Sequence, residues 1–118
     1  MDKLHTVKKS RDFSLIIHNS IFVKNRSYII YNKDNGLCHY RFGISVSKKL
    51  GNAVYRNKYK RQLRFIIDKY KKNYQNGTDY IIIIRNGYID LDFESKEKDF
   101  IYLIEKLKKQ KEIFNEKK

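Results

Sequence analysis

The sequence predicts an α/β sandwich in which helices pack against one mixed four-stranded sheet. Short segments rich in β-branched and aromatic residues alternate with longer amphipathic ones, and turns rich in Gly, Asn and Asp separate several of them. The expected element order is α-β-β-β-α-β-α. At 118 residues the chain has the length of one domain, so we expect a single domain over residues 1–118.

The amino-terminal third is predicted to form one short helix and two strands. Apolar residues at helical spacing place the helix over residues 8–17. Residues 21–24 and 27–31 are rich in Ile, Val, Phe and Tyr, which favour strands. Residues 32–39 are polar and contain an Asp-Asn-Gly turn signal, so we expect a loop there.

The central third is predicted to contain a strand that leads into a long helix. Residues 41–47 alternate between an apolar core face and a small, open face. Gly51 ends this strand, and Asn52 is a candidate cap for a helix that runs to about Lys72. An arc of about 120° on this helix is apolar and should pack on the sheet. The arc consists of Tyr55, Tyr59, Leu63, Ile66, Ile67 and Tyr70.

The last third is predicted to form a covered strand and an amphipathic helix. Four consecutive isoleucines within residues 79–85 do not alternate, which indicates a strand covered on both faces. Residues 95–109 carry one apolar stripe at helical spacing. The charged residues 111–118 should form a frayed tail.

Positive charge is concentrated in the middle of the chain. The formal net charge is +14; residues 41–72 carry 11 basic residues and 1 acidic one, whereas residues 73–118 carry 9 of each. A general preference for lysine would not remove acidic residues from one third alone. A localised positive field is typical of a protein that binds a polyanion. A solvated helix face and a helix lying on a membrane are the alternatives that this pattern leaves open.

Several other classes of protein fit the sequence poorly. No apolar run has the length of a membrane span, and the first residues lack the apolar core of a signal peptide. With Cys38 as its only cysteine the chain can form no internal disulfide, so we expect a cytoplasmic protein without a membrane partner. Its histidines are scattered, its acidic residues at 90–94 suit helix capping, and no phosphate-binding glycine loop is present. We therefore expect no metal, cofactor, small-molecule substrate or catalytic group in the protein itself.

The run FGISVSKKLGNAVYRNKYKR, from Phe42 to Arg61, closely resembles the signature of the protein subunit of bacterial ribonuclease P. The Lys8-Lys9 and Asp12-Phe13 opening and the strand at residues 79–82 are also similar. The resemblance implies a ribonucleoprotein that removes the 5′ leader from precursor transfer RNA, with an RNA subunit that performs the magnesium-dependent cleavage. It also implies that the strands at 41–47 and 80–85 are joined by a left-handed crossover, against the general preference for the right-handed form.

The resemblance further assigns residues of this chain to two RNA partners. The catalytic RNA subunit would contact Lys48, Lys49, Asn52, Arg56, Asn57, Lys58, Lys60, Arg61 and Arg64. The precursor's 5′ leader would lie in a cleft formed by Phe13, Ile17, Tyr31, Arg41, Ser45 and Ser47. Two positions depart from the family pattern. Lys58 replaces an arginine and keeps only its charge, and Ile17 stands where a second aromatic is common.

Two other functions are compatible with the residues alone. A ribosomal type of RNA-binding module with a similar layout would not distinguish precursor from mature transfer RNA. A protein-only nuclease would cleave without any RNA partner. Dependence on a leader and on an RNA subunit therefore separates the three hypotheses.

Overall fold

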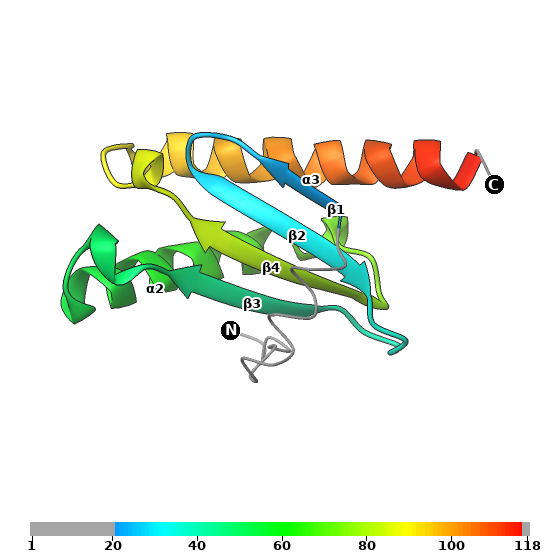
Figure 1. Cartoon of the computed structure of the whole chain (residues 1–118), viewed down its shortest axis with the longest axis horizontal. Coiled ribbons are helices and arrows are strands. Elements are labelled where there is room, and N and C mark those ends of the chain that lie inside the picture. Colours follow the sequence, from blue (N-terminus) through cyan, green and yellow to red (C-terminus); the bar gives the residue numbers. More distant parts are fainter. Residues whose placement is uncertain (1–20, 117–118) are drawn as a thin grey trace.

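A computed structural model of the chain describes residues 21–116, with side chains through residue 110 (Figure 1). The predicted helix over residues 8–17, with the candidates Phe13 and Ile17, lies outside the described residues. The strands are β1 (Ile21–Lys24), β2 (Tyr28–Asp34), β3 (Arg41–Val46) and β4 (Thr78–Ile84). The helices are α2 (Ala53–Lys69) and α3 (Phe93–Glu116), with short 3₁₀ turns η1 (Lys48–Leu50), η2 (Lys71–Asn73) and η3 (Asn86–Tyr88).

The four strands form one mixed sheet in the order β1-β2-β4-β3. β2 pairs antiparallel with both β1 and β4, whereas β3 and β4 are parallel neighbours. The chain passes from β3 to β4 through α2, which lies behind the sheet in Figure 1. This crossover is left-handed, as the family resemblance implies and against the usual preference (Figure 1).

Both helices cover the same face of the sheet and share one core with it (Figure 1). Alternate residues of each strand point to this face, among them Ile30, Phe42 and Ile82. The core residues of α2 are Tyr59, Leu63, Ile66 and Ile67, and those of α3 are Phe100, Leu103, Ile104 and Leu107. The apolar arcs predicted for the two helices therefore do pack on the sheet.

The central strand β4 is buried on both faces, as its run of isoleucines predicts. Ile82 faces the helices, while its neighbour Ile81 is equally inaccessible on the opposite face. Ile81 forms a second, smaller cluster with Tyr31 and Ile83. This opposite face of the sheet, called the open face below, carries the other alternate residues of every strand.

Two predicted boundaries are wrong for a local reason. β2 continues to Asp34 instead of ending at Tyr31, because Asn32, Lys33 and Asp34 pair with residues 78–80 of β4. α2 ends at Lys69 and not near Lys72, since the next three residues close a separate 3₁₀ turn. That turn is held by the Asn73 amide, which donates to the Tyr70 carbonyl at 2.9 Å.

The prediction that Tyr55 belongs to the buried arc of α2 is also wrong. Its side chain is 53% exposed, and Val54 beside it is exposed as well. The first turn of α2 follows η1 beyond the end of β3, so strand side chains do not cover it. The apolar arc becomes a core face only from Tyr59 onward.

α3 is longer than predicted at both ends. It begins two residues early, because the Asp92 carboxylate caps it by accepting from the Ser95 amide at 2.8 Å. Hydrogen bonding by the Ser95 side chain and by its backbone amide holds the pKa of the Asp92 carboxyl below its ordinary value. The helix continues to Glu116, through most of the tail expected to fray, since no glycine or proline follows Phe93 and Lys, Glu and Gln favour helix.

Within the described residues, no helix combines the length and the apolar character needed to cross a membrane.

Candidate nucleic-acid interface

The junction between β3 and α2 is built from two capping side chains. The Ser47 hydroxyl accepts a hydrogen bond from the Lys49 amide at 3.2 Å and starts η1. The Asn52 side-chain oxygen accepts from the amides of Val54 and Tyr55 and caps α2. The side chains of Ser47 and Asn52 thus fix the backbone conformation at this junction. A contact of either side chain with RNA would use the hydrogen-bonding groups that capping does not occupy. Ser47 lies one residue past the end of β3, where its hydroxyl caps η1.

Gly51 makes the tight link between η1 and α2 possible. Its φ of 141° is a conformation that residues with a side chain rarely adopt. A Cβ atom there would also lie 3.2 Å from the Cβ of Tyr55. The glycine therefore brings the exposed Lys48 and Lys49 directly next to the first turn of α2.

The basic residues of α2 lie on two flanks of the helix and not on one. Arg56, Lys60 and Arg64 follow one side at helical spacing, with Asn57 near the outer crest. Lys58 lies on the other side, near Lys96 of α3, whose pKa is lowered by burial and further by the charge of Lys58. The cations of α2 therefore form two basic edges along the exposed side of the helix.

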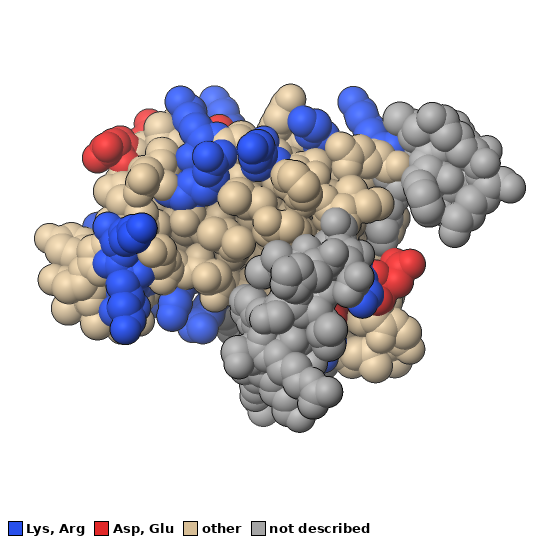
Figure 2. Space-filling model, viewed as in Figure 1, with Lys and Arg blue, Asp and Glu red and all other residues tan. Residues whose placement is uncertain are grey.

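These cations lack counter-charges in the part of the chain that the structure describes. Lys58, Lys60, Arg61 and Arg64 make no side-chain hydrogen bond or ion pair with residues 21–110. Among the described residues, the buried Arg56 Nε atom has no hydrogen-bond partner. Figure 2 shows the opposite, open face of the sheet, where Lys and Arg side chains lie mainly along the upper edge and at the left end, and the middle of the described surface is uncharged.

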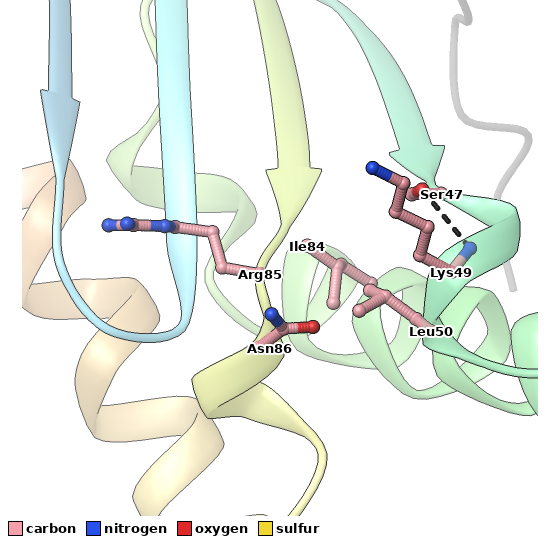
Figure 3. Close-up of a pocket in the computed structure, with 6 residues that line it drawn as sticks. All are labelled: Ser47, Lys49, Leu50, Ile84, Arg85 and Asn86. Atoms are coloured by element: carbon pink, nitrogen blue, oxygen red, sulfur yellow. Dashed lines mark hydrogen bonds between the residues drawn. The ribbon is translucent and has the colours of Figure 1, made fainter.

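A pocket of about 230 Å³ lies where the parallel strands β3 and β4 end (Figure 3). Leu50 and Ile84 lie in its middle, and Lys49 and Arg85 extend away from it in different directions (Figure 3). The Arg85 guanidinium donates to the Asn25 carbonyl at 2.6 Å, so it also ties β4 to the β1–β2 turn. Sequence reasoning did not single out Arg85, although a cation just after a buried strand was visible in the pattern.

The open face of the sheet brings together three of the predicted leader residues. Tyr31, Arg41 and Ser45 all point to this face. The Arg41 guanidinium forms two hydrogen bonds with the nearly buried Asp79 carboxylate, at 2.7 and 2.6 Å. Arg41 was predicted as a leader contact, and the structure shows that it also forms an ion pair with Asp79.

Phe22 is a residue of the open face that sequence reasoning missed. Its side chain is 49% exposed, and its ring centroid lies 5.4 Å from that of Tyr31. The two residues are cross-strand partners in the β1–β2 pair. An exposed aromatic on a short strand was the available signal, but only the register shows that it meets Tyr31.

A buried lysine lies between the two helices. The Lys96 ammonium donates to the Gln62 side chain at 3.2 Å and lies 4.3 Å from the centre of the Tyr88 ring. Burial lowers its pKa, and the nearby charge of Lys58 adds to the effect. Lys96 falls on the apolar stripe of α3, four residues before Phe100, which is the sequence signal for its burial.

Among residues 21–110, no three His, Cys, Asp or Glu side chains are grouped so that they could hold a metal ion. The described part of the chain offers a helix with unpaired cations on one side of the sheet, and on the other side the exposed Phe22 beside the half-buried Tyr31. These features define an α/β protein suited to bind RNA.

The chain belongs to the ribonuclease P protein family, because residues 1–108 match the family model described as Ribonuclease P. A relative named "Ribonuclease P protein component" from Streptococcus gordonii is 38% identical, over 88% of this chain and 87% of its own. One of the same name from Streptococcus agalactiae is 40% identical, over 88% of this chain and 94% of its own. As a member of this family, the chain is the protein subunit of an endoribonuclease that acts in transfer RNA 5′ processing.

Solved structures of the same family share the fold. The Staphylococcus aureus RNase P protein is 36% identical, with a TM-score of 0.82 over 90% of this chain and 97% of that one. The Thermotoga maritima RNase P protein is 28% identical, with a TM-score of 0.78 over 86% of this chain and 96% of that one.

Proposed function

We propose that this subunit binds the catalytic RNA of ribonuclease P through α2 and holds the 5′ leader of precursor transfer RNA on the open face of the sheet. Within the described residues, Lys58, Lys60, Arg61 and Arg64 of α2 have no counter-charge, and this observation carries the proposal. Like charges at helical spacing repel one another. RNA phosphates would relieve that repulsion and release counterions on binding.

Arg56 supports the same assignment. Its buried Nε has no acceptor among the described residues, although a buried donor left without a partner costs free energy. A guanidinium can bind a phosphate through two parallel hydrogen bonds. A phosphate of the catalytic RNA would therefore satisfy a donor that the folded chain leaves unsatisfied.

The leader assignment is supported by the composition of the open face. Phe22 and Tyr31 form an aromatic pair on which bases could stack. On β3 of the same face, Gly43 has no side chain and Ser45 has a small one, which would let a nucleic-acid backbone approach the strand. Because α2 lies on the other face, one chain could contact both RNA partners at once.

We assign the chemistry of cleavage, and the magnesium it needs, to the RNA subunit. The described part of the protein brings no cluster of metal ligands to either surface. Its contribution would be to raise affinity and to position the substrate. We accordingly expect no cleavage by the protein in the absence of the RNA subunit.

Reconstitution with the cognate RNA subunit tests this function. At low magnesium concentration, the protein should raise kcat/KM for a precursor with a leader of several nucleotides, and raise it less when the leader is cut to one. A rate and substrate affinity that do not change on adding protein would contradict the proposal. Equal binding of precursor and mature transfer RNA would favour a ribosomal type of binding module.

Paired variants separate the two surfaces. Phe22→Leu combined with Tyr31→Leu should reduce the preference for long leaders and leave affinity for the catalytic RNA within about two-fold of wild type. Arg61→Gln combined with Arg64→Gln should weaken binding of the catalytic RNA and leave the leader preference of the assembled enzyme intact. The reverse outcome would show that the two surfaces are exchanged.

A further inference from the structure

An exposed phenylalanine interrupts the basic residues on the α3 side of α2. Phe65 is 55% exposed. Lys58 and Arg61 lie seven and four residues before Phe65, and Lys69 lies four residues after it. All four side chains therefore share one stripe of the helix. Cations thus lie on both sides of one solvent-exposed ring.

The ring of Phe65 is supported from the side of α3. Phe93, at the start of α3, has its ring centroid 5.8 Å from that of Phe65, with the two planes tilted by 58°. One turn further along both helices, the Lys69 ammonium lies 3.0 Å from the Glu97 carboxylate. This ion pair ties the helices together next to the aromatic pair, so the Phe65 ring is held in place while much of it stays open to solvent.

A partly exposed aromatic at a helix seam can serve packing alone, but its neighbours here point to a ligand. Lys58 and Arg61 have no hydrogen-bond or ion-pair partner in the described structure. Cations that follow a nucleic-acid backbone, combined with an aromatic ring for a base, are the features by which proteins bind single-stranded RNA. The stripe from Lys58 to Phe65 has both.

We propose that Phe65 stacks against an unpaired base of the catalytic RNA subunit, with Lys58 and Arg61 on the phosphates that flank this base. This inference rests on the proposed function and extends it from charge to a specific base contact. The catalytic RNA is the expected partner and not the leader, because the core of the protein separates α2 from Tyr31 and Ser45 on the open face. The positive charge of the stripe complements a phosphate backbone.

Substitutions at Phe65 test the stacking contact. Equilibrium binding to the cognate catalytic RNA at fixed salt should be at least about five-fold weaker for Phe65→Leu, which keeps an apolar side chain and removes the ring. Phe65→Tyr should bind within about two-fold of wild type, because it keeps the ring. Tyr102→Leu is the matched control: Tyr102 is 60% exposed on α3 and lies outside the stripe. Binding by Phe65→Leu as tight as by Tyr102→Leu would overturn the inference.

A fluorescence measurement gives an independent reading of the same contact. The chain contains no tryptophan, so Phe65→Trp introduces a single reporter. Stacking with a base should quench its emission on addition of the catalytic RNA, whereas Tyr102→Trp should be unaffected. Unchanged emission of Phe65→Trp at saturating RNA would overturn the inference.

The outcome also distinguishes this inference from the proposed function. If Arg61→Gln with Arg64→Gln weakens RNA binding and Phe65→Leu does not, only the base contact is wrong. If wild-type protein does not bind the catalytic RNA at all, the proposed function fails and the base contact fails with it.

Discussion

α2 and α3 pack on the same face of one sheet, yet they use their charged side chains differently. On α3, Asp99 accepts from Arg26 and Ser27, and Glu97 pairs with Lys69. On α2, by contrast, most cations have no partner in the described part of the chain. Charges of the first kind hold the fold together, whereas charges of the second kind are available to a partner.

This comparison separates stability from RNA affinity. Removing a charge that is bonded inside the protein should lower the free energy of unfolding and leave RNA binding of the folded protein unchanged. Removing an unpaired charge from α2 should do the reverse, because mutual repulsion along the helix is relieved while a phosphate contact is lost. Substitutions of either kind test whether stability and RNA affinity depend on different charges.

The largest effect is expected at Asp99, whose side chain links α3 to the β1–β2 turn. Asp99→Ala should lower the free energy of unfolding by about 2–3 kcal/mol, because the Ser27 hydroxyl, on a fully buried residue, loses its acceptor. Denaturant unfolding measures the change. Glu105→Ala, at an exposed position of the same helix, is the control and should change stability by about 0.5 kcal/mol or less.

A stable Asp99→Ala protein would show that the bonds of α3 do not support the fold. Weakened RNA binding by this variant, measured on folded protein, would show that paired charges also serve the partner. Either result would remove the distinction between the two helices.

Reversing two unpaired charges of α2 should have the next largest effect. Arg61→Glu combined with Arg64→Glu should weaken binding of the catalytic RNA by about 2 kcal/mol at low salt, and less as salt is added. Because both side chains are exposed and unbonded within the described residues, the unfolding midpoint should hardly move. Nitrocellulose filter binding and thermal unfolding together measure both quantities. Loss of stability without loss of affinity would contradict the account.

Lys96 is an exception on α3, because it is a buried cation without an ion pair among the described residues, whereas Asp99, Glu97 and Lys98 have partners. Burial lowers the pKa of its ammonium group from the ordinary 10.5. A base with a lowered pKa in the folded state costs stability below that pKa, and the cost disappears as pH rises to 10.5. Lys96→Met should therefore be more stable than wild type by about 1 kcal/mol at pH 7.

The pH dependence provides the check on this prediction. The difference between Lys96→Met and wild type should shrink as pH is raised towards 10.5, because both proteins share all other titrating groups. A difference that stays constant between pH 7 and 10.5 would show that packing, and not charge, is responsible.

The smallest effect is expected at the exposed Lys98–Glu94 pair, one turn apart on α3. Lys98→Gln should lower the free energy of unfolding by about 0.3 kcal/mol, since exposed pairs at this spacing contribute little. Its affinity for the catalytic RNA should be unchanged. An RNA affinity that falls as far as for a substitution on α2 would show that net charge, and not position, determines binding.

The elements that could be predicted are those with a local pattern. Alternation placed β3, four isoleucines placed β4 as a strand covered on both faces, and Asn52 marked the start of α2. Tyr55 was assigned wrongly because a helical wheel does not show where the sheet ends. The extra length of β2 depends on pairing with β4, which no local pattern contains.

Candidate site residues could be predicted by type but not by partner. The sequence showed that α2 is basic, and the positions of its cations along the helix place them on two edges. Arg41 was assigned to RNA alone, because its ion pair with Asp79 joins two strands that are far apart in the sequence and is not visible there. Phe22 and Phe65 were missed for the opposite reason: an exposed aromatic becomes significant only when Tyr31 or Phe93 is seen beside it.

The central claim is that the unpaired cations of α2 contact phosphates of the catalytic RNA. The most direct test is the slope of log affinity against log salt concentration, measured for wild type and for Arg61→Gln combined with Arg64→Gln. Two lost phosphate contacts should reduce the steepness of this slope by about 1.5, whereas Lys98→Gln should leave it unchanged. An identical slope for wild type and the α2 variant would contradict the account.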